Sequence, residues 1–547
     1  MNILLVGLNA RYVHTNLAIR LLRDAIGDGA ALYEATINTP MEAILRHIVE
    51  AHPDVVGFST YIWNRRLVME LGSRLKTLRP EMKIILGGPE VTYDVPRIWK
   101  EAWWCDGIVP GAGEEIWRRM GRALRGKGSL HECGLLLPGE TQWTQTMGEG
   151  AISQEMFPYR GENLRGRMIY LEASRGCPFR CRFCLSSREE GVQFLGFEEA
   201  KAQFFAAIET GARVIKYVDR TANAREDEFL KFLEFINEVA PEKTQVHFEV
   251  TGRLLSPRAL EVLNHLRKGL VQMEFGVQTT TPRVLSAIDR PREWEKLRGV
   301  LQVLGEGKGV KRIVDLIAGL PFETFESFQR AFDEVYPMAD VLQLGFLKVL
   351  PGSPMEEDVK TYGMRYAKTA PYEILETPWM RAEELYRIKD VEHAVESFSI
   401  FPRSLQLLLE KRPPFTVFDG LGQLLHESGE GGKSVEDLGA VLLSYGKKIG
   451  ADLFELYDAI AVDFLSRKVC TLPHPVPGTV PAPLPKEEIF RVVGALGREG
   501  VFGENPPPVK HLVKGLRIYR HRAQDLVSLS ILLGGERTTM TRRYPHG

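Results

Sequence analysis

The sequence has almost no net charge, few cysteines and no long apolar run, and each of these absences excludes a class of protein. Its 70 basic and 71 acidic residues nearly cancel, so no global field attracts nucleic acid or an anionic membrane surface. No apolar stretch approaches the ~20 residues of a membrane-spanning helix. With 44% hydrophobic and 26% charged residues, the chain has the composition of an ordinary globular protein. Its 547 residues allow about two to four domains.

The N-terminus also lacks a basic leader and a small-residue cleavage site, so we predict that its apolar stretch is a first strand. Of the six cysteines, Cys105, Cys133 and Cys470 stand alone and the other three are clustered. This distribution does not resemble the spread framework of a secreted disulfide scaffold. We therefore expect a protein of the reducing cytoplasm, with no membrane segment.

Residues 1–130 alternate short apolar runs with amphipathic segments. This alternation predicts an α/β domain with a doubly wound, Rossmann-like parallel sheet, whose ligands bind in loops at the carboxyl ends of the strands. Those loops read GLNARY, STYIWN, GGPEVT and PGAGEE. A nicotinamide-type dinucleotide site would need G-x-G-x-x-G after the first strand, and LLVGLNAR supplies one glycine, which disfavours that ligand.

Residues 131–165 lose periodicity and gather Gly, Thr and Gln, which is typical of a linker. A second βα series occupies residues 166–368. Six βα units are too few for a closed eight-stranded barrel, so we predict a partial (β/α)6 barrel. The apolar runs expected to form its strands are MIYLEAS (168–174), RVIKYVD (213–219), QVHFEVT (245–251), VQMEFGV (271–277), RIVDLIAGL (312–320) and VLQLGFL (341–347).

Amphipathic helical patterns replace the strand patterns from residue 369 to residue 547, which predicts a mostly α-helical C-terminal domain. Within it, VKHLVKGLRIYRHR aligns basic residues on one face of an expected helix, with Leu512, Leu516 and Tyr519 opposite. A solvated face is the simpler interpretation, and an anion or nucleic-acid contact is the alternative. The basic residues are Lys510, Lys514, Arg517 and His521.

Three cysteines, Cys177, Cys181 and Cys184, lie in RGCPFRCRFC directly after the first expected barrel strand. A disulfide would use two and leave one, and a structural zinc site would need a fourth ligand that no nearby C-x-x-C or His pair supplies. Three thiolates can instead hold three irons of a four-iron cluster and leave the fourth open to a cofactor or substrate. The loop suits such a cluster: Gly176 can adopt a positive φ, Pro178 stiffens the turn, Arg180 and Arg182 can offset charge on sulfur, and Phe183 can exclude water.

The cysteine spacing, its position and the predicted barrel resemble the radical S-adenosylmethionine (SAM) enzymes. The resemblance implies that the open iron binds SAM and that one electron cleaves SAM to a 5′-deoxyadenosyl radical. It also implies SAM contacts at the strand ends, although each such residue could instead be bonded to local backbone. Glu274, inside an apolar strand, could touch cofactor or only a neighbouring arginine. The implied SAM contacts are Phe183, Asp219 in YVDRTAN, Glu249 in FEVTG, Gln278 in FGVQTT, and Gly319 and Pro321 in DLIAGLPFET.

The front domain resembles the cobalamin-binding domain of one radical SAM subclass, and the chain is identified as a member of the subgroup with a helical C-terminal extension. The sequence lacks the D-x-H-x-x-G motif that supplies a lower histidine ligand to cobalt, which leaves His14 as the sole nearby histidine for that role. A loop histidine bonded to backbone is the alternative. The resemblance implies cobalamin contacts from Asn9, Ser59, Thr60, Gly87, Gly88, Thr92, Gly111, Gly113 and Glu114.

The resemblance therefore implies three cofactors, a 4Fe-4S cluster, SAM and cobalamin, and an electron donor such as flavodoxin or ferredoxin. The leading hypothesis is methyl transfer to an unactivated carbon of a small molecule or peptide, through the 5′-deoxyadenosyl radical and methylcobalamin. The alternatives are a radical rearrangement or ring contraction without methyl transfer, and a non-enzymatic iron-sulfur or cobalamin sensor. A transfer-RNA methylthio-modifying enzyme would carry three further cysteines in its front domain, where this sequence has Cys105 and Cys133.

Overall fold

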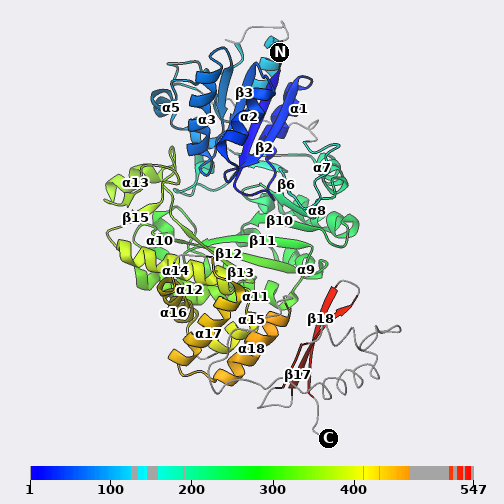
Figure 1. Cartoon of the computed structure of the whole chain (residues 1–547), viewed down its shortest axis with the longest axis vertical. Helices are drawn as coiled ribbons and strands as arrows, with labels where there is room; N and C mark the ends of the chain where they lie inside the picture. Colours follow the sequence, from blue (N-terminus) through cyan, green and yellow to red (C-terminus); the bar gives the residue numbers. More distant parts are fainter. Residues whose placement is uncertain are drawn as a thin grey trace. The chain divides into compact units, whose positions relative to one another are not determined.

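The computed structural model describes residues 2–124, 132–143, 158–188, 191–410, 412–429 and 432–466, together with residues 517–520, 526–533 and 536–543. The chain forms two compact units, residues 1–382 and residues 383–547 (Figure 1). In the ranges just given, no helix has the length and apolar character needed to cross a membrane.

The first unit begins with a five-stranded parallel sheet in the order β2-β1-β3-β4-β5, which confirms the predicted doubly wound domain. The order reverses between β1 and β3, so the loops at their carboxyl ends diverge and leave room for a ligand. Separate apolar cores cover the two faces of the sheet. The strands are β1 (Ile3–Asn9), β2 (Ala30–Thr36), β3 (Val55–Ser59), β4 (Lys83–Gly87) and β5 (Gly107–Val109), and the helices are α1 (Leu17–Ile26), α2 (Met41–Glu50), α3 (Arg65–Leu78), α4 (Pro89–Thr92), α5 (Val95–Glu101) and α6 (Glu114–Leu124).

The edge strand β2 does not appear among the apolar runs of the sequence. None of its side chains is fully buried, so its run AALYEAT lacks the apolar pattern that marks a central parallel strand. Parts of the expected linker also pack on this domain: Leu136 forms an antiparallel bridge with Ile108, and Cys133 and Leu135 enter the core. The domain boundaries drawn from the sequence stay predictions.

The barrel is a six-stranded parallel sheet in the order β13-β12-β11-β10-β9-β6, which confirms the partial barrel (Figure 1). A hairpin of β7 (Ser174–Gly176) and β8 (Val192–Phe194) brackets the cysteine loop. The barrel strands are β6 (Met168–Leu171), β9 (Val214–Tyr217), β10 (Gln245–Val250), β11 (Val271–Gln278), β12 (Val310–Ala318) and β13 (Val341–Phe346), and the helices are α7 (Phe197–Glu209), α8 (Glu226–Val239), α9 (Pro257–His265), α10 (Pro282–Ala287), α11 (Trp294–Gly307) and α12 (Phe325–Val335).

The loop after β1 joins the front domain to the barrel. It runs parallel to β6: the Met168 amide donates to the Val13 carbonyl at 2.6 Å, and the Thr15 amide donates to the Met168 carbonyl at 3.2 Å. The loop therefore satisfies backbone groups along the outer edge of β6, which would otherwise be open. The first unit ends with α13 (Met355–Thr361) and a hairpin of β14 (Arg365–Tyr366) and β15 (Ile374–Glu376).

The second unit contains the expected helices and one feature that the sequence pattern misassigned. Asp463, 2% exposed, accepts hydrogen bonds from the amides of Arg403 and Ser404 and thereby ties α18 (Leu453–Ser466) to α15 (Pro402–Leu409). The helix predicted near Arg517 and Tyr519 is wrong, because these residues form β16 of an antiparallel sheet with β17 (Leu526–Leu533) and β18 (Glu536–Arg543). Lys510, Leu512, Lys514, Leu516 and His521 lie outside the described residues. The elements are α14 (Ala382–Phe398), α15 (Pro402–Leu409), α16 (Pro414–Glu427), α17 (Val435–Lys448), α18 (Leu453–Ser466) and β16 (Arg517–Arg520).

Candidate active site

The cysteine loop leaves β7 at Gly176, whose φ of +96° requires glycine. A Cβ there would lie 2.4 Å from the Gly191 carbonyl oxygen. Cys181 is buried and Cys177 and Cys184 are half-buried. Burial raises the pKa of the Cys181 thiol, Arg290 opposes that rise, and the two neighbouring thiols reinforce it.

Two of the three thiols have a polar group beside the sulfur. Arg290 Nη1 lies 3.4 Å from Cys181 Sγ, and Thr221 Oγ1 lies 3.6 Å from Cys177 Sγ. In the part of the chain that the structure describes, no three His, Cys, Asp or Glu side chains close around a single metal ion. A four-iron cluster binds each thiolate through a different iron, so its ligands need not converge on one point. The donor set therefore fits a cluster better than a mononuclear site.

The loop after β9, in YVDRTAN, forms hydrogen bonds with the start of the cysteine loop and with the segment that follows β10. Asp219 is 2% exposed, and its carboxylate accepts from the Ala173 amide at 3.0 Å and the Ser174 hydroxyl at 2.5 Å. Burial raises the pKa of Asp219 to about 7, although these hydrogen bonds oppose the rise. Asn223 exchanges two hydrogen bonds with the Thr251 backbone. Asp219 thus holds the start of the cysteine loop, and its contact with SAM stays a prediction.

A charged cluster lies on one face of the barrel sheet, because the strand register places Lys216 beside His247 and Glu249 beside Glu274. His247 Nε2 and Lys216 Nζ lie 2.9 and 3.3 Å from Glu274 Oε2. Burial alone would raise the pKa of Glu274, but these two partners lower it to about 2. Burial, reinforced by Glu274 and Glu249, raises the pKa of Asp315 to about 8.

Of the two partners that the sequence allowed for Glu274, the neighbouring arginine is wrong: its partners are a lysine and a histidine. Sequence reasoning missed Lys216, His247 and Asp315 as site residues. The available signal was a set of charged residues interrupting otherwise apolar strands.

The other residues expected to contact SAM lie at the ends of β10, β11 and β12. Gln278 is 9% exposed and adopts φ +68°, and its buried Oε1 has no hydrogen-bond partner among the described residues. Such an atom fits a bound ligand. Glu249 is half-buried, burial raises its pKa, and Arg220 lies 4.0 Å away. Gly319 adopts φ +82° beside buried Pro321, and half-buried Phe183 lies in the cysteine loop.

In the front domain, the segments that follow β3, β4 and β5 make close contacts and hydrogen bonds with one another. A Cβ on Gly88 would lie 2.5 Å from the Thr60 carbonyl oxygen, and φ there is +104°. Thr92 Oγ1 donates to the Gly88 carbonyl at 2.9 Å and accepts from the Gly111 amide at 3.2 Å. The fully buried Thr60 hydroxyl has no partner among the residues described, as expected of a group that meets a ligand. Ser59 accepts from Asn16 at 2.9 Å, Gly87 is the last residue of β4, and Gly113 lies in the loop after β5.

Sequence reasoning also missed an aromatic pair at this edge of the sheet. The rings of Tyr61 and Trp63 stack with centroids 4.5 Å apart, and Trp63 is 45% exposed. The signal was available in STYIW, because two aromatic residues in a short loop at a strand end can form a flat apolar surface.

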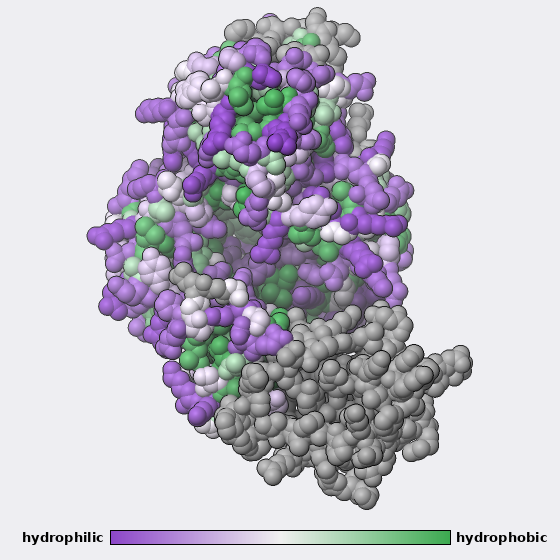
Figure 2. All heavy atoms as spheres, in the orientation of Figure 1, coloured by the Kyte–Doolittle hydropathy of each residue, from purple (hydrophilic) through white to green (hydrophobic). Residues whose placement is uncertain are grey.

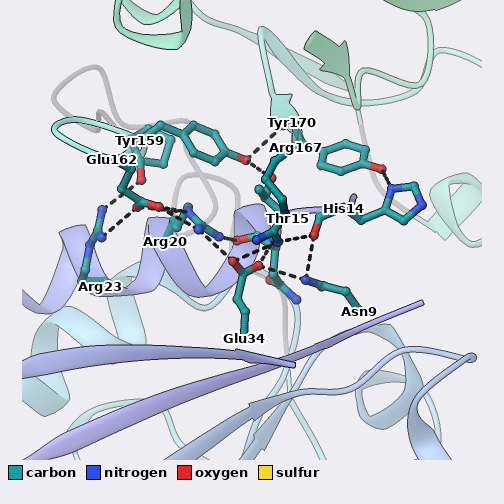
Figure 3. A network of polar contacts seen from close by, with 12 residues as sticks. Asn9, His14, Thr15, Arg20, Arg23, Glu34, Tyr159, Glu162, Arg167 and Tyr170 are labelled. Atoms are coloured by element: carbon teal, nitrogen blue, oxygen red, sulfur yellow. Dashed lines mark hydrogen bonds and ion pairs between the residues drawn. The ribbon is translucent and has the colours of Figure 1, made fainter. Parts of the chain in front are cut away.

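A polar network surrounds the loop after β1 (Figure 3). His14 Nδ1 lies 2.6 Å from the Tyr170 hydroxyl, so the histidine is bonded to a barrel side chain, not to backbone. Burial, with Arg11, Lys216 and Arg167, lowers the pKa of His14. Asn9 donates to the His14 carbonyl and to Glu34, both at 3.0 Å. The roles of Asn9 and His14 toward cobalamin stay predictions.

The front domain also contacts the cysteine loop directly. Glu114, at the start of α6, pairs with Arg175 at 2.8 Å, two residues before Cys177. Figure 2 shows a recess between the front domain and the barrel, with hydrophilic and hydrophobic residues on its walls. The ion pair thus links one segment expected to bind cobalamin to the strand that leads into the cysteine loop.

Comparison with known families identifies both parts of this site. Residues 171–335 match the Radical SAM superfamily, and residues 3–119 match the B12 binding domain. The chain therefore contains a radical SAM domain and a cobalamin-binding domain, and these domains imply a 4Fe-4S cluster, SAM and cobalamin as cofactors. Residues 360–478 match a third family, described as Protein of unknown function (DUF4080). This match begins in the last part of the first unit and continues into the helices of the second unit.

Relatives agree with this assignment. The cobalamin-dependent radical SAM methyltransferase TokK of Streptomyces tokunonensis is 25% identical over 68% of this chain and 58% of its own length. The anaerobic magnesium-protoporphyrin IX monomethyl ester cyclase of Rubrivivax gelatinosus is 22% identical over 54% of this chain and 56% of its own. This chain thus spans little more than half of these relatives. The cobalamin-dependent radical enzyme OxsB has the same fold, with a TM-score of 0.56, 12% identity, and coverage of 91% of this chain and 81% of its own.

Proposed function

We propose that the protein transfers a methyl group from SAM, by way of cobalamin, to an unactivated carbon of its substrate. The observation that carries the proposal is the ion pair between Glu114 and Arg175, which joins a predicted cobalamin loop to the cysteine loop at 2.8 Å. A substrate carbon must meet the radical source and the methyl donor in one cavity, and this pair holds the two cofactor loops together. The relative TokK, a methyltransferase by name, supports the same reaction.

In this proposal, Cys177, Cys181 and Cys184 hold the cluster, and Gln278, Glu249 and the Gly319 backbone bind SAM. Thr60, Thr92 and the Gly88 backbone bind cobalamin. When bound, these cofactors supply a hydrogen-abstracting radical and a transferable methyl group.

The substrate would lie against the charged face of the barrel. Lys216 can pair with a substrate carboxylate, and Glu249 and Asp315 can accept from an amino or hydroxyl group. A polar substrate therefore fits this face. The reaction also requires a reductant, and we propose a low-potential donor such as flavodoxin or ferredoxin, in a reducing cytoplasm.

The test is anaerobic reconstitution of the full chain with iron, sulfide and hydroxocobalamin, followed by iron and cobalt analysis of one desalted sample. About four irons and one cobalamin per chain are expected. The loaded protein is then incubated with SAM carrying a deuterated methyl group, a strong reductant and an extract of small molecules and peptides. Methyl transfer predicts a product heavier by the label, which the Cys181→Ala variant does not form.

The second candidate function is a radical reaction without methyl transfer, and the similarity to the cyclase of Rubrivivax gelatinosus favours it. Both reactions release 5′-deoxyadenosine, but only methyl transfer also forms S-adenosylhomocysteine. Release of 5′-deoxyadenosine without S-adenosylhomocysteine would support the second candidate over the first. Release of neither would favour a sensor.

A further inference from the structure

One cationic side chain contacts the cluster loop from a distant part of the barrel. Arg290 follows α10 and reaches Cys181, 109 positions away, with Nη1 at 3.4 Å from Sγ. Its Nη2 also donates to the Gly276 carbonyl in β11. The guanidinium therefore bridges a barrel strand and a predicted cluster ligand.

The surrounding backbone keeps Arg290 in this place. The Arg182 amide in the cysteine loop donates at 3.2 Å to the Ile288 carbonyl, so the loop is bonded to the segment that carries Arg290. The Met355 amide in turn donates at 3.0 Å to the Arg182 carbonyl. These bonds fix the loop independently of the Arg290 side chain, so an uncharged residue at position 290 can leave the loop in place.

The arginines within the cysteine loop are directed elsewhere. The sequence suggested that Arg180 and Arg182 offset the charge on sulfur, but Arg182 pairs with Asp358 through two contacts at 2.5 and 2.7 Å. Arg180 donates to the Ser187 carbonyl at 3.2 Å. No carboxylate of the described ranges forms an ion pair with Arg290, so its charge is not neutralised as that of Arg182 is.

We propose that Arg290 raises the reduction potential of the cluster by holding its positive charge against Cys181. This inference rests on the cluster assigned under the proposed function, but not on methyl transfer. Reduction adds one electron from an external low-potential donor to the cluster, with no bond formed or broken. A fixed positive charge beside a ligand sulfur stabilises the more negative, reduced cluster more than the oxidised one.

Thr221 provides a matched neutral contact. Its hydroxyl lies 3.6 Å from Cys177 Sγ but donates at 2.8 Å to the Arg220 carbonyl, so its proton is directed away from sulfur. Replacement of Thr221 by valine removes a polar neighbour of one cysteine without removing a charge. The proposal expects this change to have a much smaller effect than loss of Arg290.

The test is a redox titration of the reconstituted full-length protein, without SAM, in which electron paramagnetic resonance measures the reduced cluster. Arg290→Met is expected to make reduction at least tenfold less favourable, a shift of about 59 mV to lower potential for a one-electron couple. Arg290→Lys should retain most of the wild-type potential. Thr221→Val and Arg182→Met should each shift it by less than half as much as Arg290→Met.

An unchanged potential in an Arg290→Met protein with full iron content would overturn the proposal, as would equal shifts in Arg290→Met and Arg182→Met. If Arg290→Met binds less iron, Arg290→Lys decides: full iron and a near wild-type potential support the proposal, and iron loss in both variants assigns Arg290 to loop folding alone. Wild-type protein that binds no cluster would overturn the proposed function itself, which separates the two failures.

Discussion

Arg20 is predicted to be the largest single contributor to the stability of the network in Figure 3. Its side chain is 4% exposed and contacts two carboxylates, Glu34 at 2.9 Å and Glu162 at 2.8 Å. The substitution Arg20→Met keeps much of the side-chain volume but removes the charge. Glu34, 13% exposed, would then remain ionised in a mostly buried position.

The expected cost follows from what Glu34 retains. Breaking a buried ion pair by removing one partner costs about 3–5 kcal/mol. Glu34 keeps a longer ion pair with Arg167, at 3.4 Å, and hydrogen bonds from the Asn16 amide at 2.6 Å and from Asn9 at 3.0 Å. We therefore expect the lower end of this range, about 3 kcal/mol. The cost should depend on pH. Burial alone would raise the pKa of Glu34, but Arg20 and the hydrogen bonds lower it, so its stabilisation is present above pH 4.5 and is lost as the pH falls through the lowered pKa.

Cys105 offers a local measurement of this stability, because its thiol is 4% exposed within the front core and reacts only when the domain opens. Alkylation at pH 8, resolved by residue with mass spectrometry, should be roughly a hundredfold faster in Arg20→Met, since 1.4 kcal/mol corresponds to tenfold. The control is Arg74→Met, whose 44% exposed side chain pairs with exposed Glu42 and Glu70. That variant should stay within about fivefold of wild type. If Arg20→Met also stays within that limit, the reasoning about buried charge is refuted.

Three further predictions concern the candidate site. Replacement of Cys177, Cys181 or Cys184 by alanine should reduce bound iron to near zero, whereas the control Cys105→Ala should retain it. Full iron content in one of the first three variants would remove that residue from the ligand set. Gly88→Ala should weaken cobalamin binding at least tenfold, measured by absorbance titration, because its Cβ would lie 2.5 Å from the Thr60 carbonyl oxygen. The control for backbone strain is Gly139→Ala, where φ is +94° but no atom lies near the added Cβ, and this variant should bind cobalamin normally. Tyr372→Phe should destabilise the first unit by about 1–3 kcal/mol, because Glu90, 5% exposed, loses a 2.8 Å hydrogen bond. Burial raises the pKa of Glu90, and the Tyr372 hydrogen bond opposes this rise because it stabilises the ionised carboxylate. The loss should therefore be greatest at neutral pH, where the carboxylate is ionised, and an equal alkylation rate of Cys105 in both proteins would contradict it.

The strands of the barrel could be predicted from sequence because parallel strands buried on both faces are short, nearly continuous apolar runs. Local motifs also gave the cysteine loop and the glycine turns, and Gly176 and Gly88 both take a positive φ, which glycine adopts readily. The edge strand β2 was not predicted, because its partly exposed side chains do not form a continuous apolar run. In the second unit, β16 was predicted as part of a helix, because the spacing of basic residues in a short segment fits a helix as well as a strand.

The partners of the site residues could not be predicted, because they depend on contacts between distant segments. Arg290 is separated from Cys181 by 109 positions, and Glu114 from Arg175 by 61. Arginine is common on protein surfaces, and only the fold decides which one faces sulfur. The sequence suggested that Arg180 and Arg182 offset the charge on sulfur, but Arg182 pairs with Asp358 and Arg180 donates to the Ser187 carbonyl. The arginine that lies beside a thiol is Arg290.

Backbone hydrogen bonds join the cobalamin-binding domain to the first strand of the barrel. Asn9 is the last residue of β1, and the loop after it carries His14 and forms hydrogen bonds along β6 through Val13 and Thr15. A parallel pairing of this kind has a register, and a shift by one residue would turn His14 away from Tyr170. The segment that protects the open edge of the barrel therefore also sets where the cobalamin loops lie. We therefore expect a change in the length of the loop after β1 to move the cofactor loops, because it would break the pairing with β6.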